Sequence, residues 1–255
     1  MGRPAAGAGL YRDPHGRSAY PRKARCMPPA RAGFHAAALG RSSRSLPQLG
    51  TAAGGDGMIA DALLSASPVI EAEDAAALNS VRESAVHLAV WRRPLPAPLA
   101  GLADLDWRAI DDVDSAVLVA TLGAALPLLL ETAGYPDIRA ALAGEIVALA
   151  RRFADLTAAD TLRIRLEVIE TDACRRFHAD YVTFRLLMPL VGPGTQWTHR
   201  GSDQPTGTLC PGDVGIFKGR LLTDEPTILH RSPPLGDSGQ KRLLLAIDPI
   251  NEADL

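Results

Sequence analysis

The sequence predicts an α+β protein whose helical N-terminal half packs on a small antiparallel β-sandwich or barrel formed by its C-terminal half. Two observations carry this prediction. Apolar residues recur with a helical period as far as about Leu156, and after Thr161 the period changes to two. Gly- and Pro-rich turns then separate several short β-rich runs, with no helical pattern between them.

The first 57 residues differ in composition from the rest of the chain. The 255 residues carry a formal net charge of −2, but residues 1–57 hold nine basic and two acidic groups, whereas residues 58–255 hold 18 and 27. The first segment contains no Val or Ile, so it cannot bury enough apolar surface to offset its ordering entropy. We expect residues 1–57 to be a disordered basic extension, and we favour a mis-assigned start before Met58 over a targeting signal.

Charge and hydropathy exclude several classes of protein. The acidic residues 58–255 argue against a nucleic-acid partner, because such binding depends on clustered Lys and Arg. The most apolar run, Ala116 to Leu130, is too short to cross a bilayer and contains Gly123 and Pro127. Three cysteines without a C-x-x-C pair do not make a disulfide-rich scaffold, and no apolar export signal precedes them. We therefore expect a cytoplasmic protein with no membrane partner.

Residues 58–160 are expected to form a mainly helical region. In the stretch Asp137–Leu156, apolar residues three and four positions apart define one face of an amphipathic helix. Gly134 ends the preceding helix, and Pro136 begins the next. The proline-rich stretch Trp91–Pro98 is expected to be an extended connection. The other helical patterns lie at Ala72–Val86 and Val113–Glu131.

Residues 161–255 are expected to form the β-region. Leu162–Ile169 alternates apolar and charged residues, as a half-buried strand does. Residues 192–212 are expected to be loop. Further short β-rich runs lie at Val182–Leu190, Val214–Phe217, Thr227–His230 and Arg242–Ile247.

Three side chains of the β-region form a candidate metal site. His178 and Asp180 are two residues apart at the start of a predicted strand, so their side chains point to the same side. His230 follows 50 residues later on another predicted strand. Two His and one carboxylate on one face of a metal is the arrangement of non-haem Fe(II) oxygenases. The alternatives are that these residues are purely structural, or that the metal is zinc, with Cys174 as a further soft ligand.

Other side chains are candidates for binding small molecules. Arg242, twelve residues after His230, is the first choice for gripping a co-substrate carboxylate with two hydrogen bonds, and Arg185 is the second. Trp197 and His199 lie in the expected loop and are candidate substrate or lid contacts. Arg175 and Arg176 form either a solvated surface or an attraction for an anionic substrate. The chain has no phosphate-binding loop, dinucleotide fingerprint or Ser-His-Asp order.

Several of these segments resemble a bacterial family known as domain of unknown function 1826. The resemblance runs from about residue 60 to the end of the chain and supports Met58 as the start. It implies no activity, although an association of the family with zinc homeostasis suggests a metal-related partner. The matching segments are Trp91–Pro96, Cys174–Leu187, Gly192–Trp197, Gly212–Asp213, Phe217–Gly219, His230–Pro234 and Arg242–Asp248.

The order H-x-D, then His, then Arg is also similar to that of cupins and of 2-oxoglutarate-dependent oxygenases, whose fold is a double-stranded β-helix. That resemblance implies a cupin-like jelly-roll barrel in which His178, Asp180 and His230 bind Fe(II) and Arg242 binds 2-oxoglutarate. The leading hypothesis is therefore an Fe(II) oxygenase-like enzyme that uses 2-oxoglutarate. The alternatives are a non-catalytic metal-binding or sensing protein linked to zinc homeostasis, and an interaction protein without metal. The substrate and the oligomeric state are not predicted.

Overall fold

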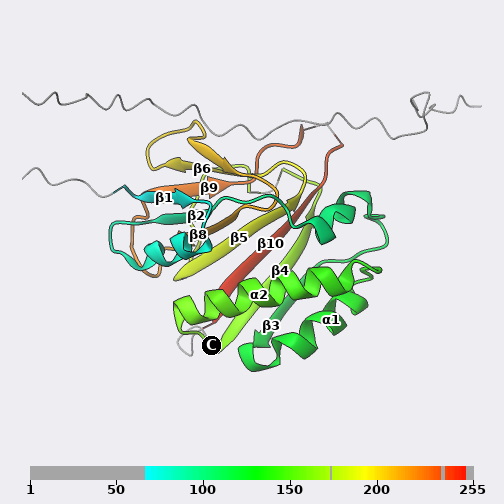
Figure 1. The fold of residues 1–255 in the computed structure, drawn as a ribbon. Coiled ribbons are helices and arrows are strands. Elements are labelled where there is room, and N and C mark those ends of the chain that lie inside the picture. Colours follow the sequence, from blue (N-terminus) through cyan, green and yellow to red (C-terminus); the bar gives the residue numbers. More distant parts are fainter. Residues whose placement is uncertain (1–66, 173, 237–238, 251–255) are drawn as a thin grey trace, which may run out of the picture. The chain divides into compact units, whose positions relative to one another are not determined.

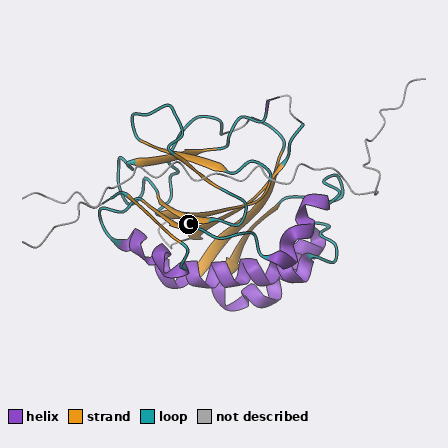
Figure 2. Ribbon diagram, turned by 45° about the horizontal axis from the view of Figure 1, so that its top comes forward, coloured by secondary structure: helices purple, strands orange, loops and turns teal. Residues whose placement is uncertain are grey.

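The fold is seen in a computed structural model that describes residues 67–172, 174–236 and 239–250. The expected basic extension over residues 1–57, and the proposed start at Met58, lie outside these residues. The described part contains two sheets and a layer of helices (Figures 1 and 2).

The larger sheet has seven strands and contains segments from both halves of the sequence. The long strands β10 (Arg242–Ile250) and β4 (Thr161–Ile169) pair antiparallel, and the central strand β5 (Phe184–Val191) pairs with the other side of β10. Only β1 and β2 pair in parallel among the strand pairs described. In spatial order the strands are β1 (Val69–Ala72), β2 (Leu88–Trp91), β8 (Val214–Lys218), β5 (Phe184–Val191), β10 (Arg242–Ile250), β4 (Thr161–Ile169) and β3 (Val113–Leu118).

The smaller sheet lies over one face of the larger sheet (Figure 2). Its spatial order is β7 (Gly207–Leu209), β6 (Thr195–His199) and β9 (Ile228–Arg231). After β4 the chain crosses repeatedly between the sheets, with β5, β8 and β10 in the larger sheet and β6, β7 and β9 in the smaller. Such crossing between two antiparallel sheets is the pattern of a jelly roll. The C-terminal half therefore has a fold of the double-stranded β-helix type.

Helices cover the opposite face of the larger sheet (Figure 2). The prediction of a helix over residues 137–156 is confirmed by α2 (Arg139–Thr157). Its predicted apolar face is buried at Leu142, Ile146, Leu149 and Phe153. Gly134 has a positive φ of 81°, as expected of a residue that ends a helix. No helix among the described residues is long and apolar enough to cross a membrane. The helices are η1 (Ala75–Arg82), η2 (Ala97–Asp104), η3 (Val119–Thr121), α1 (Leu122–Thr132) and α2 (Arg139–Thr157).

The larger sheet separates two apolar clusters. In β10, Leu243, Leu245 and Ile247 belong to the cluster that includes the helices, whereas Leu244 and Ala246 belong to the cluster between the sheets. Because side chains alternate along a strand, Arg242 and Asp248 share the face of Leu244 and Ala246. The buried polar groups of β10 therefore lie on the side of the smaller sheet.

The structure corrects the expected helical content of the N-terminal half. Residues 113–118 form the edge strand β3 instead of the start of a helix, and only Leu122–Thr132 is α-helical. A short apolar run does not distinguish a strand from a buried helix, and pairing with β4 decides it here. In the expected helix Ala72–Val86, only the 3-10 helix η1 forms.

A further difference concerns short strands. The expected loop 192–212 contains β6 and β7, and β1 and β2 also lie in the part expected to be mainly helical.

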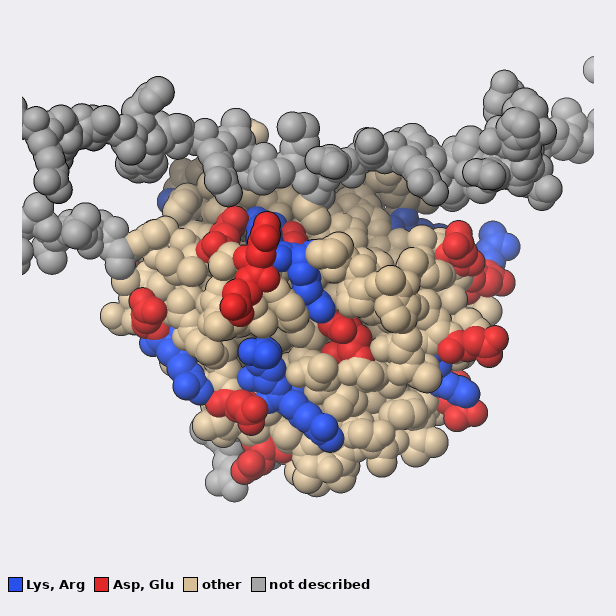
Figure 3. All heavy atoms as spheres, in the orientation of Figure 1, with Lys and Arg blue, Asp and Glu red and all other residues tan. Residues whose placement is uncertain are grey.

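On the face that Figure 3 shows, basic and acidic side chains are interspersed. That face has no uniformly basic patch of the kind that binds nucleic-acid phosphates.

Candidate metal centre

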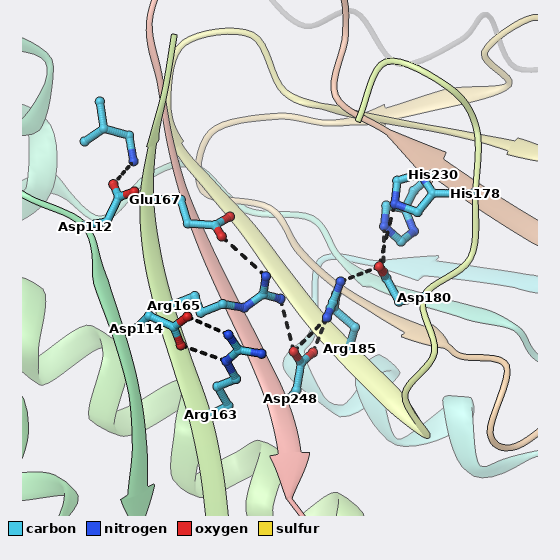
Figure 4. A network of polar contacts seen from close by, with 11 residues as sticks. Asp112, Asp114, Arg163, Arg165, Glu167, His178, Asp180, Arg185, His230 and Asp248 are labelled. Atoms are coloured by element: carbon cyan, nitrogen blue, oxygen red, sulfur yellow. Dashed lines mark hydrogen bonds and ion pairs between the residues drawn. The ribbon is translucent and has the colours of Figure 1, made fainter. Parts of the chain in front are cut away.

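The three predicted metal ligands converge at one end of the space between the sheets (Figure 4). One ligand atom each from His178, Asp180 and His230 can be chosen so that all lie within 4.8 Å of one another. The Nε2 atom of His230 lies 3.0 Å from Oδ2 of Asp180, and Nε2 of His178 lies 3.6 Å from Oδ1. Residues 50 positions apart therefore meet as the sequence predicts.

Backbone pairing brings the two histidines together. The N–H of His178 donates to the carbonyl of His230 at 3.0 Å, and the N–H of His230 donates to the carbonyl of His178 at 2.9 Å. His178 thus extends the smaller sheet beside β9, and the two imidazole centres lie 4.8 Å apart. Asp180 lies between this pairing and β5, which begins at Phe184 and not at the predicted Val182, and its carboxylate contacts both imidazoles.

Hydrogen bonding orients the His178 ring for metal binding. Its Nδ1 lies 2.9 Å from the carbonyl of Arg176, and because a carbonyl only accepts, Nδ1 carries the proton. In the neutral ring, Nε2 then presents a lone pair toward Asp180. In metal-binding histidines, the ring nitrogen that does not bind the metal usually donates its N–H to a carbonyl or a similar acceptor.

The geometry of Asp180 fits a bound cation. Its Oδ2 atom is buried and accepts no hydrogen bond of acceptable geometry from the part of the chain that the structure describes, although His230 Nε2 is only 3.0 Å away. A buried carboxylate oxygen without a donor is costly, and a metal shared with the imidazole nitrogens would satisfy it. The donor set of two imidazoles and one carboxylate suits iron, zinc and related divalent ions.

A series of alternating basic and acidic side chains begins at Asp180 and continues through Arg185 (Figure 4). Arg185 Nη1 lies 2.5 Å from Asp180 Oδ1, and the other edge of the same guanidinium donates two hydrogen bonds of 2.7 Å to Asp248. Arg165 then bridges Asp248 at 3.1 Å and Glu167 at 3.3 Å. Arg185 therefore contacts carboxylates on two sides, and the structure places it behind the metal site.

The charges of the centre shift the pKa values of its groups in different directions. Burial opposes ionisation of Asp180, but its contacts with His178, His230 and Arg185 outweigh burial and hold its pKa far below the ordinary value. The contact with Asp180 raises the pKa of His178, whereas burial lowers the pKa of His230. Asp180 is thus an anion over the physiological pH range, as a metal ligand must be.

Arg242 occupies a buried polar pocket with hydroxyl groups around it. The side chain is 1% exposed, and Nε donates to the carbonyl of Pro193 at 2.7 Å. Nη1 donates to the hydroxyl of Ser232, and Nη2 donates to that of Thr195 at 3.2 Å. No carboxylate among the described residues forms an ion pair with Arg242, and burial lowers its pKa to about 10. A buried guanidinium without a counter-ion suits an anionic ligand.

The two residues predicted as lid contacts lie in different environments. Trp197 is 5% exposed within the apolar cluster between the sheets, and its indole N–H is buried without a hydrogen-bond partner. His199 is exposed at the end of β6, with its ring edge-on to Trp197 at 6.1 Å. A substrate contact by either residue stays a prediction.

The segment before His178 lines a hollow of about 480 Å³ beside the metal centre. The predicted zinc ligand Cys174 is an exposed free thiol here and does not belong to the convergent group of three. Arg175 and Arg176 are exposed in the same hollow.

Sequence reasoning gave no role to Thr195, Ser232 or Asp248. Ser232 lies two residues beyond His230, a spacing that places both side chains on one side of an extended chain. Thr195 lies in a segment expected to be loop, and Asp248 contacts Arg185 across 63 residues, so neither gave a local signal.

The jelly-roll topology defines a fold of the cupin-like, double-stranded β-helix class, and the His, Asp and His set is a candidate metal site within it. The chain belongs to the family described as "Protein of unknown function (DUF1826)", whose profile matches residues 72–248, so the predicted resemblance is confirmed. No curated protein matches the chain.

Among solved structures, the chain is similar to oxygenases. One is the dioxygenase for auxin oxidation 1 from Arabidopsis thaliana in complex with 2-oxoglutarate, with 12% identity, 74% of this chain and 94% of that chain covered, and a TM-score of 0.48. Another is a prolyl-4-hydroxylase from Pseudomonas putida, with 13% identity, 70% and 98% covered, and a TM-score of 0.39. At these scores the likenesses assign neither activity nor substrate to this chain.

Proposed function

We propose that the protein is an Fe(II)- and 2-oxoglutarate-dependent oxygenase. The observation that carries the proposal is the buried guanidinium of Arg242, which has no ion pair among the described residues and lies on the face of β10 turned to the smaller sheet, as the His178, Asp180 and His230 set does. Its hydroxyl partner Ser232 lies two residues from His230, about 7 Å along an extended chain. A dicarboxylate such as 2-oxoglutarate would offer one carboxylate to Arg242 and its other end to the metal.

The residues of the site have separate roles in this proposal. His178, Asp180 and His230 would hold the metal, a ligand set that suits iron. When bound, iron with 2-oxoglutarate supplies the oxidising chemistry, and the co-substrate is converted to succinate and carbon dioxide. Arg185 fixes Asp180, and Phe217, whose ring centre is 4.7 Å from that of His230, limits water on the inner side.

Arg242 would bind the distant carboxylate of the co-substrate. Its Nε, Nη1 and Nη2 atoms already donate hydrogen bonds to Pro193, Ser232 and Thr195, so the guanidinium group is held in place before the ligand binds. Such preorganisation lowers the entropy cost of binding. The two hydroxyl groups are also able to donate to a carboxylate once their own orientation changes.

The test uses the full chain with Fe(II) and 2-oxoglutarate under anaerobic conditions. A visible metal-to-ligand band is expected, followed by succinate production when oxygen is admitted. Arg242→Gln is expected to weaken 2-oxoglutarate binding at least 10-fold, because a charge-assisted two-pronged contact is lost. Arg163→Gln is the matched control, because Arg163 is exposed and paired with Asp114.

The outcomes separate the proposed enzyme from the alternatives. Metal binding without the visible band or succinate would favour a metal-binding or sensing protein. Zinc retained in preference to Fe(II) would point the same way. Metal uptake that is unchanged in His178→Ala and His230→Ala would leave a structural role for both histidines and overturn the metal site.

A further inference from the structure

We propose that the hollow beside His178 is an anion-binding site formed by Arg175 and Arg176, and that it selects substrates carrying a carboxylate or phosphate group. That the anion belongs to the substrate rests on the proposed oxygenase function, whereas the anion site itself does not. The hollow measures about 480 Å³ and is lined by Asp172, Cys174, Arg175, Arg176 and His178.

The hollow adjoins the candidate metal centre at His178. This histidine lines the hollow and also belongs to the convergent group of three, and its side chain is 37% exposed, compared with 15% for Asp180 and 8% for His230. His178 is therefore the most accessible member of the candidate centre. An anion bound in the hollow would lie next to this member.

Among the residues that line the hollow, arginines outnumber carboxylates, in an otherwise acidic part of the chain. Residues 58–255 hold 27 acidic and 18 basic groups, yet two arginines and one aspartate line the hollow. The Asp172 carboxylate already accepts hydrogen bonds from the N–H groups of Leu235, at 2.7 Å, and Gly236, at 3.3 Å. Among the described residues, neither Arg175 nor Arg176 has a side-chain ion pair.

The backbone that presents the arginines is fixed on both sides. Asp172 is bonded to Leu235 and Gly236, and the carbonyl of Cys174 accepts the N–H of Ser232 at 3.1 Å. On the other side, His178 is paired with His230. Two guanidinium groups carried on a fixed segment lose less entropy on binding an anion than groups on a free one. Their delocalised charge and multiple donors match carboxylate and phosphate oxygens.

Cys174 supplies a built-in reporter of the electrostatic potential, because it is an exposed free thiol in the hollow. The metal-free full chain is labelled with an anionic sulfonatoethyl and a cationic trimethylammonioethyl methanethiosulfonate, and labelling of the Cys174 peptide is followed by mass spectrometry. Arg175→Gln/Arg176→Gln is expected to lower the ratio of anionic to cationic labelling rates about 5- to 10-fold at low ionic strength. A ratio unchanged from the wild type would overturn the site.

The matched control is Arg151→Gln/Arg152→Gln, another exposed pair of adjacent arginines, on helix α2. It removes the same charge from the covering helix layer and should leave the ratio unchanged. Because the ratio compares two reagents at one thiol, an altered reactivity of Cys174 itself cancels. An equal fall of the ratio in both double variants would show a general charge effect and count against the site.

Binding is tested with inorganic phosphate and acetate as separate probes at constant ionic strength. The probe that matches the site should slow labelling of Cys174 by a neutral methanethiosulfonate in a saturable way, and the Arg175→Gln/Arg176→Gln variant should lose this protection. Protection by phosphate alone would indicate a phosphorylated ligand, and protection by acetate alone a carboxylate. Absence of protection by both would overturn the anion site.

The substrate part of the proposal has its own test. In the anaerobic complex with Fe(II) and 2-oxoglutarate, the protecting anion should shift the visible band, because it binds beside His178. Protection without a shift would place the anion away from the substrate position and overturn that part. Protection in a protein that forms no such band would instead show that the proposed oxygenase function fails while the anion site stands.

Discussion

At the scale of single residues, the position of Asp180 depends on Arg185. Arg185 contacts Oδ1 of Asp180 with one edge and both oxygens of Asp248 with the other, which leaves Oδ2 free for a metal. We predict that Arg185→Met weakens Co(II) binding by about 10- to 100-fold, as loss of a group that orients a metal ligand usually does. Calorimetry and the visible spectrum of bound Co(II) measure the effect.

Two further variants make this prediction specific to Arg185. Arg163→Met removes an equal charge from an exposed pair with Asp114 and should leave Co(II) affinity within about 2-fold, since exposed pairs contribute little. Arg185→Lys keeps the charge but not the two-edged fork, so it should restore only part of the affinity. Full affinity in Arg185→Met would show that Asp180 is held without Arg185.

At the scale of secondary structure elements, helix α2 ends in an unfavourable residue. Ala158 follows the helix with φ of 54° and ψ of 36°, and its N–H donates to the carbonyl of Ala154. A Cβ atom is strained in this left-handed conformation, whereas glycine is not. We predict that Ala158→Gly raises the free energy of unfolding by about 1 kcal/mol, measured by urea denaturation. Ala148→Gly, at an exposed position inside α2, should instead lower it by about 0.5–1 kcal/mol.

The contact between β6 and β7 requires a glycine. A Cβ on Gly207 would lie 2.5 Å from carbon atoms of the Trp197 indole, which packs over the facing strand. We predict that Gly207→Ala destabilises the protein by about 1–3 kcal/mol and changes the near-ultraviolet circular dichroism of its tryptophans. Gly144→Ala in α2 meets no atom within 4 Å and should stabilise slightly. Equal effects of both substitutions would contradict this account of the contact.

The elements also show which parts of the fold are readable from sequence. Alternation identified β4, and a clear helical period identified α2, because each of these elements has one buried and one exposed side. In contrast, the sequence of β2 is only four apolar or aromatic residues beside a proline-rich stretch, and the apolar sequence of β3 continues into that of α1. Neither sequence has an alternation that predicts a strand. Their pairing with β8 and β4 decides their structure, and that information is not local.

At the scale of the whole molecule, sequence order predicted the three residues that converge at the candidate metal site, but not the network of ion pairs around them. His178 and Asp180 carry a two-residue signal, and His230 lies on a predicted strand. The series of ion pairs from Arg185 through Asp248 to Arg165 forms only because β5, β10 and β4 are neighbours in the larger sheet. A charged residue on a strand does not by itself reveal which neighbouring strand supplies its partner.

A metal bound at the proposed site would link separate parts of the fold. His178 and Asp180 come from the segment before β5, and His230 comes from β9 of the smaller sheet. Binding to the folded state alone stabilises it, by about 2.7 kcal/mol at a free metal concentration 100 times the dissociation constant. For a domain of this size we predict a rise in Tm of about 5–10 °C with Co(II). Scanning calorimetry of the full chain with Co(II) and with chelator measures the difference.

The histidines provide the control for this last prediction. His178→Ala should lose most of the Co(II)-dependent rise, because its Nε2 is one of the three converging ligand atoms. His199→Ala should keep the rise, because His199 is exposed at the end of β6 and does not belong to that group. Comparable losses in the two variants would mean that Co(II) binds histidines nonspecifically. A rise that survives only in the wild type and in His199→Ala requires a metal held between the segment before β5 and the smaller sheet.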